Sequence, residues 1–127
     1  MENLVKDFLK QKRFAVIGSF RNESKYAYKI LKTLKNKDYE VYPVNPKLKE
    51  VYGITCYPTV KDIPVVVDVV DIVTPPAVTE KIVLECKEKG ITRVWMQPGA
   101  ESEKAIKFCK DNDIDVIHSL CVMMESI

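Results

Sequence analysis

Residues 14–45 read FAVIGSFRNESKYAYKILKTLKNKDYEVYPVN and hold a strand, a helix and a second strand in direct succession. The wholly apolar run at residues 14–17 ends at Gly18, which is typical of a buried parallel strand. Residues 27–34 place their apolar side chains on one helical face, and residues 39–45 are rich in β-forming residues. This order predicts two parallel strands joined by a right-handed helical crossover.

The alternation of helices and strands continues along the rest of the chain. We expect helices at residues 2–12, 76–89 and around 105–109, a helical turn at 59–64, an edge strand near 55–57, and strands at 65–73, 93–97 and 115–117. Pro76 suits the first turn of its helix and Gly90 its C-terminal stop. Val78, Ile82 and Cys86 are expected on the buried side of that helix. The prediction is one doubly wound α/β domain with helices on both faces of a parallel sheet.

Length and composition fit a single globular domain, residues 1–127. Hydrophobic residues make up 46% and charged residues 30% of the chain, and a chain of this size buries roughly two-thirds of its unfolded surface without a metal or disulfide. No apolar run approaches the ~20 residues of a membrane span. The composition therefore predicts neither a membrane protein, nor a secreted precursor, nor a multidomain enzyme.

Charge is unevenly distributed although the net charge is only +2. Residues 1–49 carry 12 Lys or Arg and 5 Asp or Glu, whereas residues 50–127 carry 8 and 13. A basic first half in a nearly neutral chain favours a localised anion site over a nucleic-acid surface, which usually needs a strongly basic domain. The alternative is that lysines simply cover solvent-facing helices.

The four cysteines, Cys56, Cys86, Cys109 and Cys121, show no C-x-x-C spacing. Because His118 is the single histidine, the sequence contains none of the usual zinc patterns, and we predict no metal site. Reduced, mostly buried thiols in a cytoplasmic protein are the simplest interpretation.

Ligands of a doubly wound sheet bind beyond the carboxyl ends of its strands, near the point where the strand order reverses. Four segments should meet there: residues 18–25, 45–47, 74–76 and 97–99. In the first segment, Gly18 permits a tight turn, and Ser19 with the free helix N–H groups can donate to phosphate oxygens. Arg21 and Lys25 would add charge-assisted contacts. The full G-x-G-x-x-G fingerprint and the P-loop pattern are both absent, so a merely polar loop is the alternative.

The second segment differs from that of a nicotinamide-dinucleotide site. Such sites place Asp or Glu after the second strand to hold the ribose diol, whereas this chain has Lys47 in that region. A lysine suits a ribose that carries a phosphate, as in coenzyme A or NADP. The alternative is a solvated surface lysine.

The two remaining segments offer a rigid wall and an amide. Residues 74–76 are Thr-Pro-Pro, whose prolines have no N–H, so this segment could pack against a flat adenine, line a channel or only end the strand. Gln97 could hydrogen-bond an amide-rich ligand. Trp95, two residues earlier, is expected in the core.

No catalytic group stands out in the sequence. His118 lies close to Cys121, which suggests a Cys–His nucleophile, but no acid is placed to orient the histidine. A packed histidine and a buried thiol are the favoured interpretation. Asp68 and Asp71 lie in or beside a β-rich run, and nothing marks them as an acid–base pair. We therefore predict no catalytic residue.

Three segments and one cysteine together point to a known family: Ala15-Val16-Ile17-Gly18-Ser19, Tyr42-Pro43-Val44-Asn45-Pro46-Lys47, Val94-Trp95-Met96-Gln97-Pro98-Gly99 and Cys121. In this order and spacing, the chain resembles the small stand-alone coenzyme A-binding domain proteins, which are similar to the N-terminal domain of the succinyl-CoA synthetase alpha subunit. The resemblance implies a Rossmann-like fold that binds coenzyme A at the ends of the strands. Many relatives have Phe-Arg where Val73-Thr74 stands, so one cationic contact is expected to be missing.

The resemblance also implies roles for individual residues. The phosphate region would lie against Gly18, Ser19, Phe20 and Arg21, and the ribose phosphate against Lys47. The rest of the ligand would lie against Thr74, Pro75, Pro76, Gln97, Pro98 and Gly99. Lys25 and Asn45 are added from their position and chemistry. The synthetase's phosphorylated histidine belongs to a different domain, so His118 is not expected to take its role.

We therefore expect a cytoplasmic, non-catalytic protein that binds coenzyme A or acyl-CoA. Three alternatives remain open: an NADP-binding oxidoreductase-like domain, a thiol enzyme or acyl carrier that uses Cys121 and His118, and a regulatory or partner subunit of an acyl-CoA enzyme. Besides the ligand, the expected partner is an acyl-CoA enzyme or a second copy paired through an edge strand. Nucleic acid and membrane are not expected partners.

Overall fold

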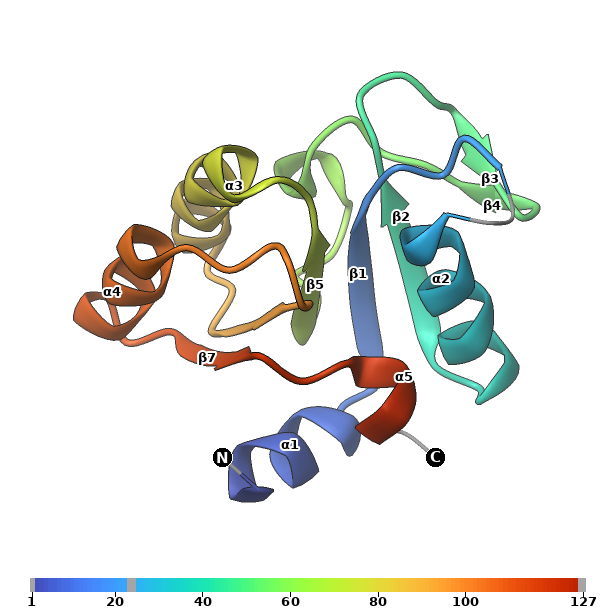
Figure 1. Cartoon of the computed structure of the whole chain (residues 1–127). Coiled ribbons are helices and arrows are strands. Elements are labelled where there is room, and N and C mark those ends of the chain that lie inside the picture. The colour runs from blue at the N-terminus through green and yellow to red at the C-terminus, as the bar shows by residue number, and fades with distance from the viewer. Residues whose placement is uncertain (1, 23–24, 126–127) are drawn as a thin grey trace.

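The computed structural model describes residues 2–22 and 25–125. A five-stranded sheet forms its centre, with the strands in the order β2-β1-β5-β6-β7. These strands are β1 (Arg13–Gly18), β2 (Glu40–Val44), β5 (Val69–Val73), β6 (Arg93–Met96) and β7 (Asp115–His118). Every neighbouring pair is parallel, and the sheet twists from β2 to β7 (Figure 1). The parallel sheet predicted from the sequence is confirmed.

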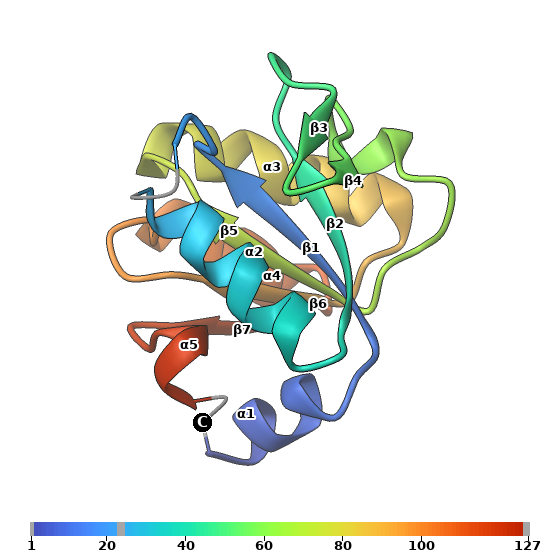
Figure 2. The same ribbon diagram turned by 90° about the vertical axis from the view of Figure 1, so that its right-hand side faces the viewer.

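Helices cover both faces of this sheet (Figures 1 and 2). One face carries α1 (Glu2–Leu9), α2 (Tyr26–Asn36) and α5 (Val122–Glu125), and the other carries α3 (Pro76–Lys89) and α4 (Glu103–Asp111). Because strand side chains alternate in direction, the neighbouring residues Phe14 and Ala15 of β1 belong to two different cores. The fold is a doubly wound, Rossmann-like α/β domain, as the sequence predicts.

The order of the strands places a switch point between β1 and β5. The chain leaves β1 through α2 toward β2 on one side and later enters β5 on the other side of β1. The connections that leave the two neighbouring strands therefore diverge. A crevice between diverging connections, beyond the carboxyl ends of the strands, is where ligands of such sheets bind.

The connection between β2 and β5 differs from the sequence prediction. A single edge strand was expected near residues 55–57, whereas β3 (Glu50–Val51) and β4 (Ile54–Thr55) form an antiparallel hairpin. The hairpin turns through Tyr52 and Gly53, both with positive φ, which is the geometry of a type I′ turn. Tyr57 then makes one parallel bridge to Val44 at the edge of β2. The helical turn expected next is the 3-10 turn η1 (Val60–Asp62).

Two elements are shorter than the sequence predicts. The helix expected over residues 2–12 ends at Leu9, because the backbone N–H groups of Lys12 and Arg13 donate to Asp68 Oδ2, at 3.2 and 2.9 Å, instead of continuing the helix. The strand expected over residues 65–73 contains only β5, Val69–Val73. The β-branched residues before it lie outside the sheet.

The predicted buried face of α3 is confirmed at Ile82 and Cys86 and wrong at Val78. Val78 was expected in the core, but its side chain is 42% exposed. The helix is rotated because Thr79 takes an interior position, where its hydroxyl bonds to the Thr74 hydroxyl at 2.9 Å and to the Pro75 carbonyl at 3.3 Å. Pro76 as the first residue and Gly90 as a left-handed stop are confirmed. The buried positions of α3 are Thr79, Ile82, Val83 and Cys86.

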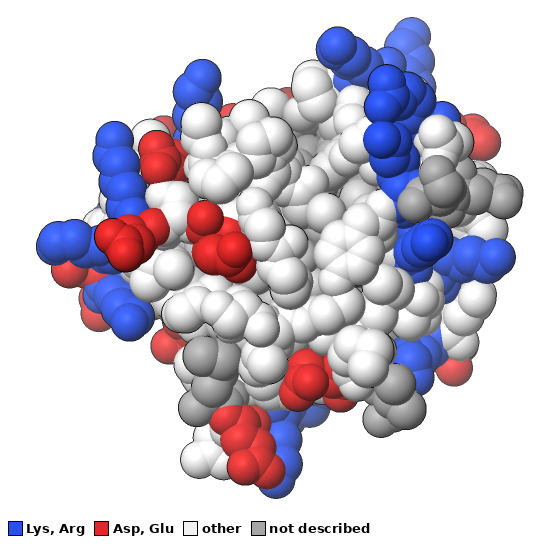
Figure 3. Space-filling model, in the orientation of Figure 1, with Lys and Arg blue, Asp and Glu red and all other residues white. Residues whose placement is uncertain are grey.

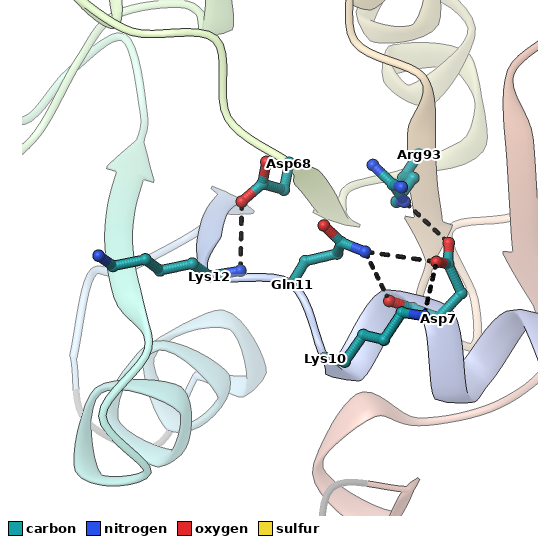
Figure 4. Close-up of polar contacts among 6 residues, drawn as sticks. All are labelled: Asp7, Lys10, Gln11, Lys12, Asp68 and Arg93. Atoms are coloured by element: carbon teal, nitrogen blue, oxygen red, sulfur yellow. Dashed lines mark hydrogen bonds and ion pairs between the residues drawn. The ribbon is translucent and has the colours of Figure 1, made fainter.

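Polar contacts fix α1 to the amino ends of the strands, at the edge of the sheet opposite the crevice (Figure 4). Arg93 at the start of β6 places its Nε 2.9 Å from Asp7 Oδ2. Gln11 reaches back to the Asp7 carbonyl at 2.9 Å. These contacts stabilise the fold but lie away from the crevice and do not line it.

Candidate ligand-binding site

A cavity of about 680 Å³ lies at the switch point, against the carboxyl ends of β1, β2 and β5. Its wall consists of residues 17–21, 44–48 and 73–75, with Val78 from α3. Its volume is in the range of small-molecule sites. The structure therefore brings three of the four predicted segments together in one cavity. Residues 23 and 24 of the first segment lie outside the described residues.

Gly18 ends β1 at a point where three chain segments approach closely. A Cβ atom at this position would lie 2.7 Å from both Ala27 Cβ and the carbonyl oxygen of Val73. Contacts this short do not occur between real side chains, so only glycine fits between α2 and β5 here. The sequence predicted a tight turn at Gly18, and the structure shows close packing as the reason for the glycine.

Asn45 joins the first and second segments of the wall. Its Nδ2 donates to the Gly18 carbonyl at 2.8 Å, and its Oδ1 accepts from the Lys47 N–H at 2.9 Å. Asn45 lines the cavity, but its side chain is already engaged within the protein. Its role in the structure is to position the loop that carries Lys47.

Two cations line the cavity, Arg21 from the first segment and Lys47 from the second. Both side chains are exposed. Among the described lining residues there is no Asp or Glu, so no carboxylate is present where a dinucleotide-binding sheet would hold a ribose diol. This part of the site can attract phosphate groups. It has no acidic side chain that could accept hydrogen bonds from a free ribose diol.

The beginning of α2 faces the same crevice. Lys25 is its N-cap residue, and its side chain makes no capping hydrogen bond. The first N–H groups of a helix have no partner within the helix and suit an anion. Lys25 itself is not part of the described cavity wall. Ser19 is exposed on the wall, and Phe20 lines it from a largely buried position, 5% exposed.

The third segment separates the main cavity from a second hollow of about 280 Å³. Thr74 and Pro75 line both spaces, and Pro98 and Gly99 line only the second. The two spaces are therefore neighbours along the carboxyl edge of the sheet. Pro76 is exposed on α3 and lines neither.

Gln97 has a different role from the predicted one. Its side chain is completely buried; Nε2 donates to Asp71 Oδ1 at 2.9 Å, and Oε1 accepts from the Val122 N–H at 3.0 Å. The amide thus connects β5 to the start of α5 and is not free for a ligand. Burial raises the pKa of the Asp71 carboxyl to about 8, against the opposing hydrogen bond from Gln97, so this carboxyl carries a proton at neutral pH.

Cys121 and His118 contact different partners in the structure. The Tyr26 hydroxyl contacts Cys121 Sγ, while His118 Nδ1 lies 3.0 Å from the Ser119 hydroxyl. Neither residue belongs to the described wall of the cavity or of the second hollow. Trp95 is fully buried, as the sequence predicts, and its Nε1 donates to the Leu120 carbonyl at 2.8 Å. The described residues contain no cluster of His, Cys, Asp and Glu that could hold a metal ion.

Sequence reasoning missed five apolar residues of the wall: Ile17, Val44 and Val73 at the strand ends, and Leu48 and Val78 beyond them. Leu48 stands alone between Lys47 and Lys49, which gives no periodic signal. Val78 was assigned to the core because its spacing to Ile82 suits one helix face. Both side chains add apolar surface beside the predicted residues Phe20 and Pro75.

Comparison with known proteins identifies the family. The chain matches the CoA binding domain family over residues 12–127 and belongs to it. It is similar to the acetate–CoA ligase [ADP-forming] of Methanocaldococcus jannaschii, with 41% identity over 80 residues, 63% of this chain and 11% of that protein. It is also similar to the acetate–CoA ligase [ADP-forming] II subunit alpha of Pyrococcus furiosus, with 39% identity over 88 residues, 68% of this chain and 19% of that one.

A solved structure shares the fold over nearly the whole chain. A hypothetical protein from Pyrococcus horikoshii OT3 has 33% identity and a TM-score of 0.93, covering 98% of this chain and 87% of that one. The chain thus spans only 11–19% of these two ligases, but most of this smaller protein. Within the described residues, no helix has the length and apolar character needed to cross a membrane.

Proposed function

We propose that this protein binds coenzyme A or an acyl-CoA in the switch-point cavity and has no catalytic site of its own. The observation that carries the proposal is the presence of Arg21 and Lys47 in one cavity whose described wall contains no acidic residue. Coenzyme A carries a diphosphate and, separately, a phosphorylated ribose, so it needs cations at two places. Membership of the CoA binding domain family supports the same ligand.

In this proposal each part of the wall meets one part of the ligand. Ser19, Arg21 and the first N–H groups of α2 bind the diphosphate, with Lys25 adding positive charge beside them. Lys47 binds the ribose phosphate. The pantetheine arm passes Thr74 and Pro75 toward the second hollow, where Pro98 and Gly99 form the wall.

Calorimetric titration with coenzyme A, dephospho-coenzyme A, NADP and NAD tests this assignment. We expect saturable binding of coenzyme A and weaker binding of dephospho-coenzyme A. Lys47→Ala should weaken coenzyme A binding by ~1–3 kcal/mol, the scale of a charged hydrogen bond, and should remove the preference for the 3′-phosphate. Lys49→Ala is the matched control, because Lys49 is equally exposed but lies outside the described wall.

Two other results would replace the proposal. Tight NADP binding without competition from coenzyme A would favour an NADP-binding oxidoreductase-like domain, which the same lysine suits. Acylation of Cys121 by an acyl-CoA would favour an acyl carrier or thiol enzyme. An unreactive Cys121 agrees with a binding protein. The four cysteines are free thiols, which is typical of reducing compartments, and we place the protein in the cytoplasm on that ground.

A second candidate function is that of a partner subunit for an acyl-CoA enzyme. It is favoured by the similarity to a ligase subunit of which this chain spans 19%. Purification of the protein from its own cells, with and without coenzyme A, tests it: co-purification with an acyl-CoA ligase or transferase would support the subunit role. A second copy as the partner would appear as a dimer in the same experiment.

A further inference from the structure

The outer face of α2 carries a row of lysines at helical spacing. Ala27, Ile30, Leu31 and Leu34 form its buried side. Lys25, Lys29, Lys32 and Lys35 lie on the other sides, and we call these four the α2 lysine face. Three of them are exposed and Lys25 is partly exposed. Figure 3 shows Lys and Arg gathered on the side of the molecule where α2 and the loop after β2 lie.

α2 differs from the other helices in the charges of its own residues. Within the part of the chain that the structure describes, none of the four lysines forms an ion pair, whereas Lys61 pairs with Glu88 of α3 and Lys107 with Asp111 of α4. α2 itself contains no Asp or Glu. Lysines three and four residues apart repel each other by a few tenths of a kcal/mol per pair. The free protein thus keeps an arrangement that weakens its own helix.

The ligand in the cavity does not account for the whole row. Lys25 stands at the end of α2 that faces the crevice, but Lys32 is seven residues further along. At a rise of ~1.5 Å per residue, that separation is about 10 Å, longer than the Debye length of ~8 Å at physiological salt. Lys32 and Lys35 therefore add little to the attraction of an anion at the crevice.

Two tyrosines lie beside the lysines and add aromatic surface to this side of the molecule. Tyr28 of α2 contacts Tyr52 of the β3–β4 hairpin edge to face, with ring centroids 5.9 Å apart. Tyr52 is 38% exposed. Tyrosine is enriched where proteins bind one another, because its ring is rigid and apolar while its hydroxyl can hydrogen-bond to water.

We propose that the α2 lysine face, with Tyr28 and Tyr52 beside it, is a docking surface for an acidic segment of a separate protein. Charge complementarity selects carboxylates or phosphates as its counterpart. The face contains no arginine, the residue of choice for phosphate and nucleic-acid recognition, and the net charge of +2 is low for a nucleic-acid-binding domain. It also lacks the exposed aliphatic side chains with which a surface helix enters a membrane. An acidic protein segment fits best, whichever ligand occupies the cavity.

Site-specific photo-crosslinking tests the docking surface. A photoreactive amino acid replaces Lys32 in one version of the protein and the exposed Lys104 of α4 in the control, and both are irradiated in the cells that make the protein. We expect crosslinks at position 32, absent at position 104, to protein peptides rich in Asp and Glu. Adding Lys35→Glu should reduce these crosslinks about fivefold, the effect of losing exposed ion pairs, while Lys81→Glu on α3 should not.

Each other outcome overturns the proposal. Crosslinks at position 32 to RNA or lipid would assign the face to those anions, and crosslinks to the protein's own sequence would assign it to a second copy. Equal crosslinking at both positions would show that the lysines are an ordinary solvent-exposed surface without a specific partner. Coenzyme A titration of Lys35→Glu separates this test from that of the ligand site. Lys35 lies beyond the Debye length from the crevice, so the docking proposal expects unchanged affinity, and loss of crosslinks with intact binding concerns the surface alone.

Discussion

The side-chain amide of Asn45 donates a hydrogen bond of 2.8 Å to the carbonyl oxygen of Gly18. This bond ties the loop after β2 to the end of β1, and the other end of the same amide accepts from the Lys47 N–H. The position of the proposed phosphate-binding lysine therefore depends on a neutral residue two positions before it. The proposed contact of Lys47 with the ligand depends on the two loops being held together.

Replacing this link should affect both stability and binding. Asn45→Ala removes both hydrogen bonds, and we expect the free energy of unfolding to fall by about 1 kcal/mol, measured by urea denaturation. Coenzyme A affinity should fall as well, because the loop that carries Lys47 loses its anchor. Asn36→Ala at the exposed end of α2 is the control and should change neither quantity. Unchanged affinity in Asn45→Ala would show that the loop is held by other contacts.

Gly18 offers a second test, directed at packing. In Gly18→Ala the new methyl group would lie 2.7 Å from Ala27 Cβ and from the Val73 carbonyl, so α2 and β5 must move apart. Overpacking of this kind costs typically ~1–3 kcal/mol, and we expect a lower urea midpoint together with weaker coenzyme A binding. Ser19→Ala, one residue later and exposed, should leave the midpoint almost unchanged. An equally stable Gly18→Ala protein would contradict the tight approach.

The layers and most strand positions could be predicted because each follows from a local pattern. Residues 14–17 are apolar on every side since both faces of β1 are covered, and the spacing of Ala27, Ile30 and Leu31 follows from the single buried side of α2. Once strands alternate with helices, chirality and short connections leave few topologies. The position of the cavity beyond the strand ends then follows from the fold.

The sequence did not predict side-chain orientations that are set by the hydrogen-bond partners of buried polar groups. Gln97 stands in a predicted ligand segment, but its amide turns inward because a buried Asp71 and the Val122 N–H need partners. Val78 is exposed instead of buried because Thr79 takes the interior position, where its hydroxyl bonds to the Thr74 hydroxyl and the Pro75 carbonyl. In both cases a buried polar group decides which way a side chain points. The partners of Gln97 lie in other elements, whereas those of Thr79 lie four and five residues before it. No periodic pattern contains that information.

The buried Asp71 predicts a specific dependence of stability on pH. Burial raises the pKa of its carboxyl to about 8 from an ordinary value of 3.8. Between these values the folded state holds one proton more than the unfolded state, so this carboxyl's contribution to stability is full below about pH 4 and is lost as the pH rises toward 8. The loss amounts to at most ~1.4 kcal/mol per pH unit.

Asp71→Asn should remove this dependence, because an amide has no proton to lose in that range. We expect urea unfolding at pH 5, 6.5 and 8 to show the variant gaining stability relative to the natural protein as the pH rises. Asp115→Asn is the control, since Asp115 is exposed on β7. A constant difference between Asp71→Asn and the natural protein across the three pH values would mean that Asp71 is ionised in the fold.

Thr74 is the position where the site should gain affinity from a single change. It lines both the main cavity and the second hollow, and the resemblance indicates that many relatives carry an arginine there. Its hydroxyl bonds to Thr79, but Thr79 keeps a second partner in the Pro75 carbonyl at 3.3 Å. Thr74→Arg should therefore leave the fold intact and place a third cation at the cavity.

We expect Thr74→Arg to bind coenzyme A about fivefold more tightly, the effect of one solvent-exposed charge contact of ~1 kcal/mol, with a steeper loss of affinity as salt is raised. Thr92→Arg is the matched control, because Thr92 is exposed next to the amino end of β6, away from the cavity. An equal gain from both variants would reflect net charge alone. A gain confined to Thr74→Arg, and shared by coenzyme A and dephospho-coenzyme A, would assign the new cation to the diphosphate and leave the ribose phosphate to Lys47.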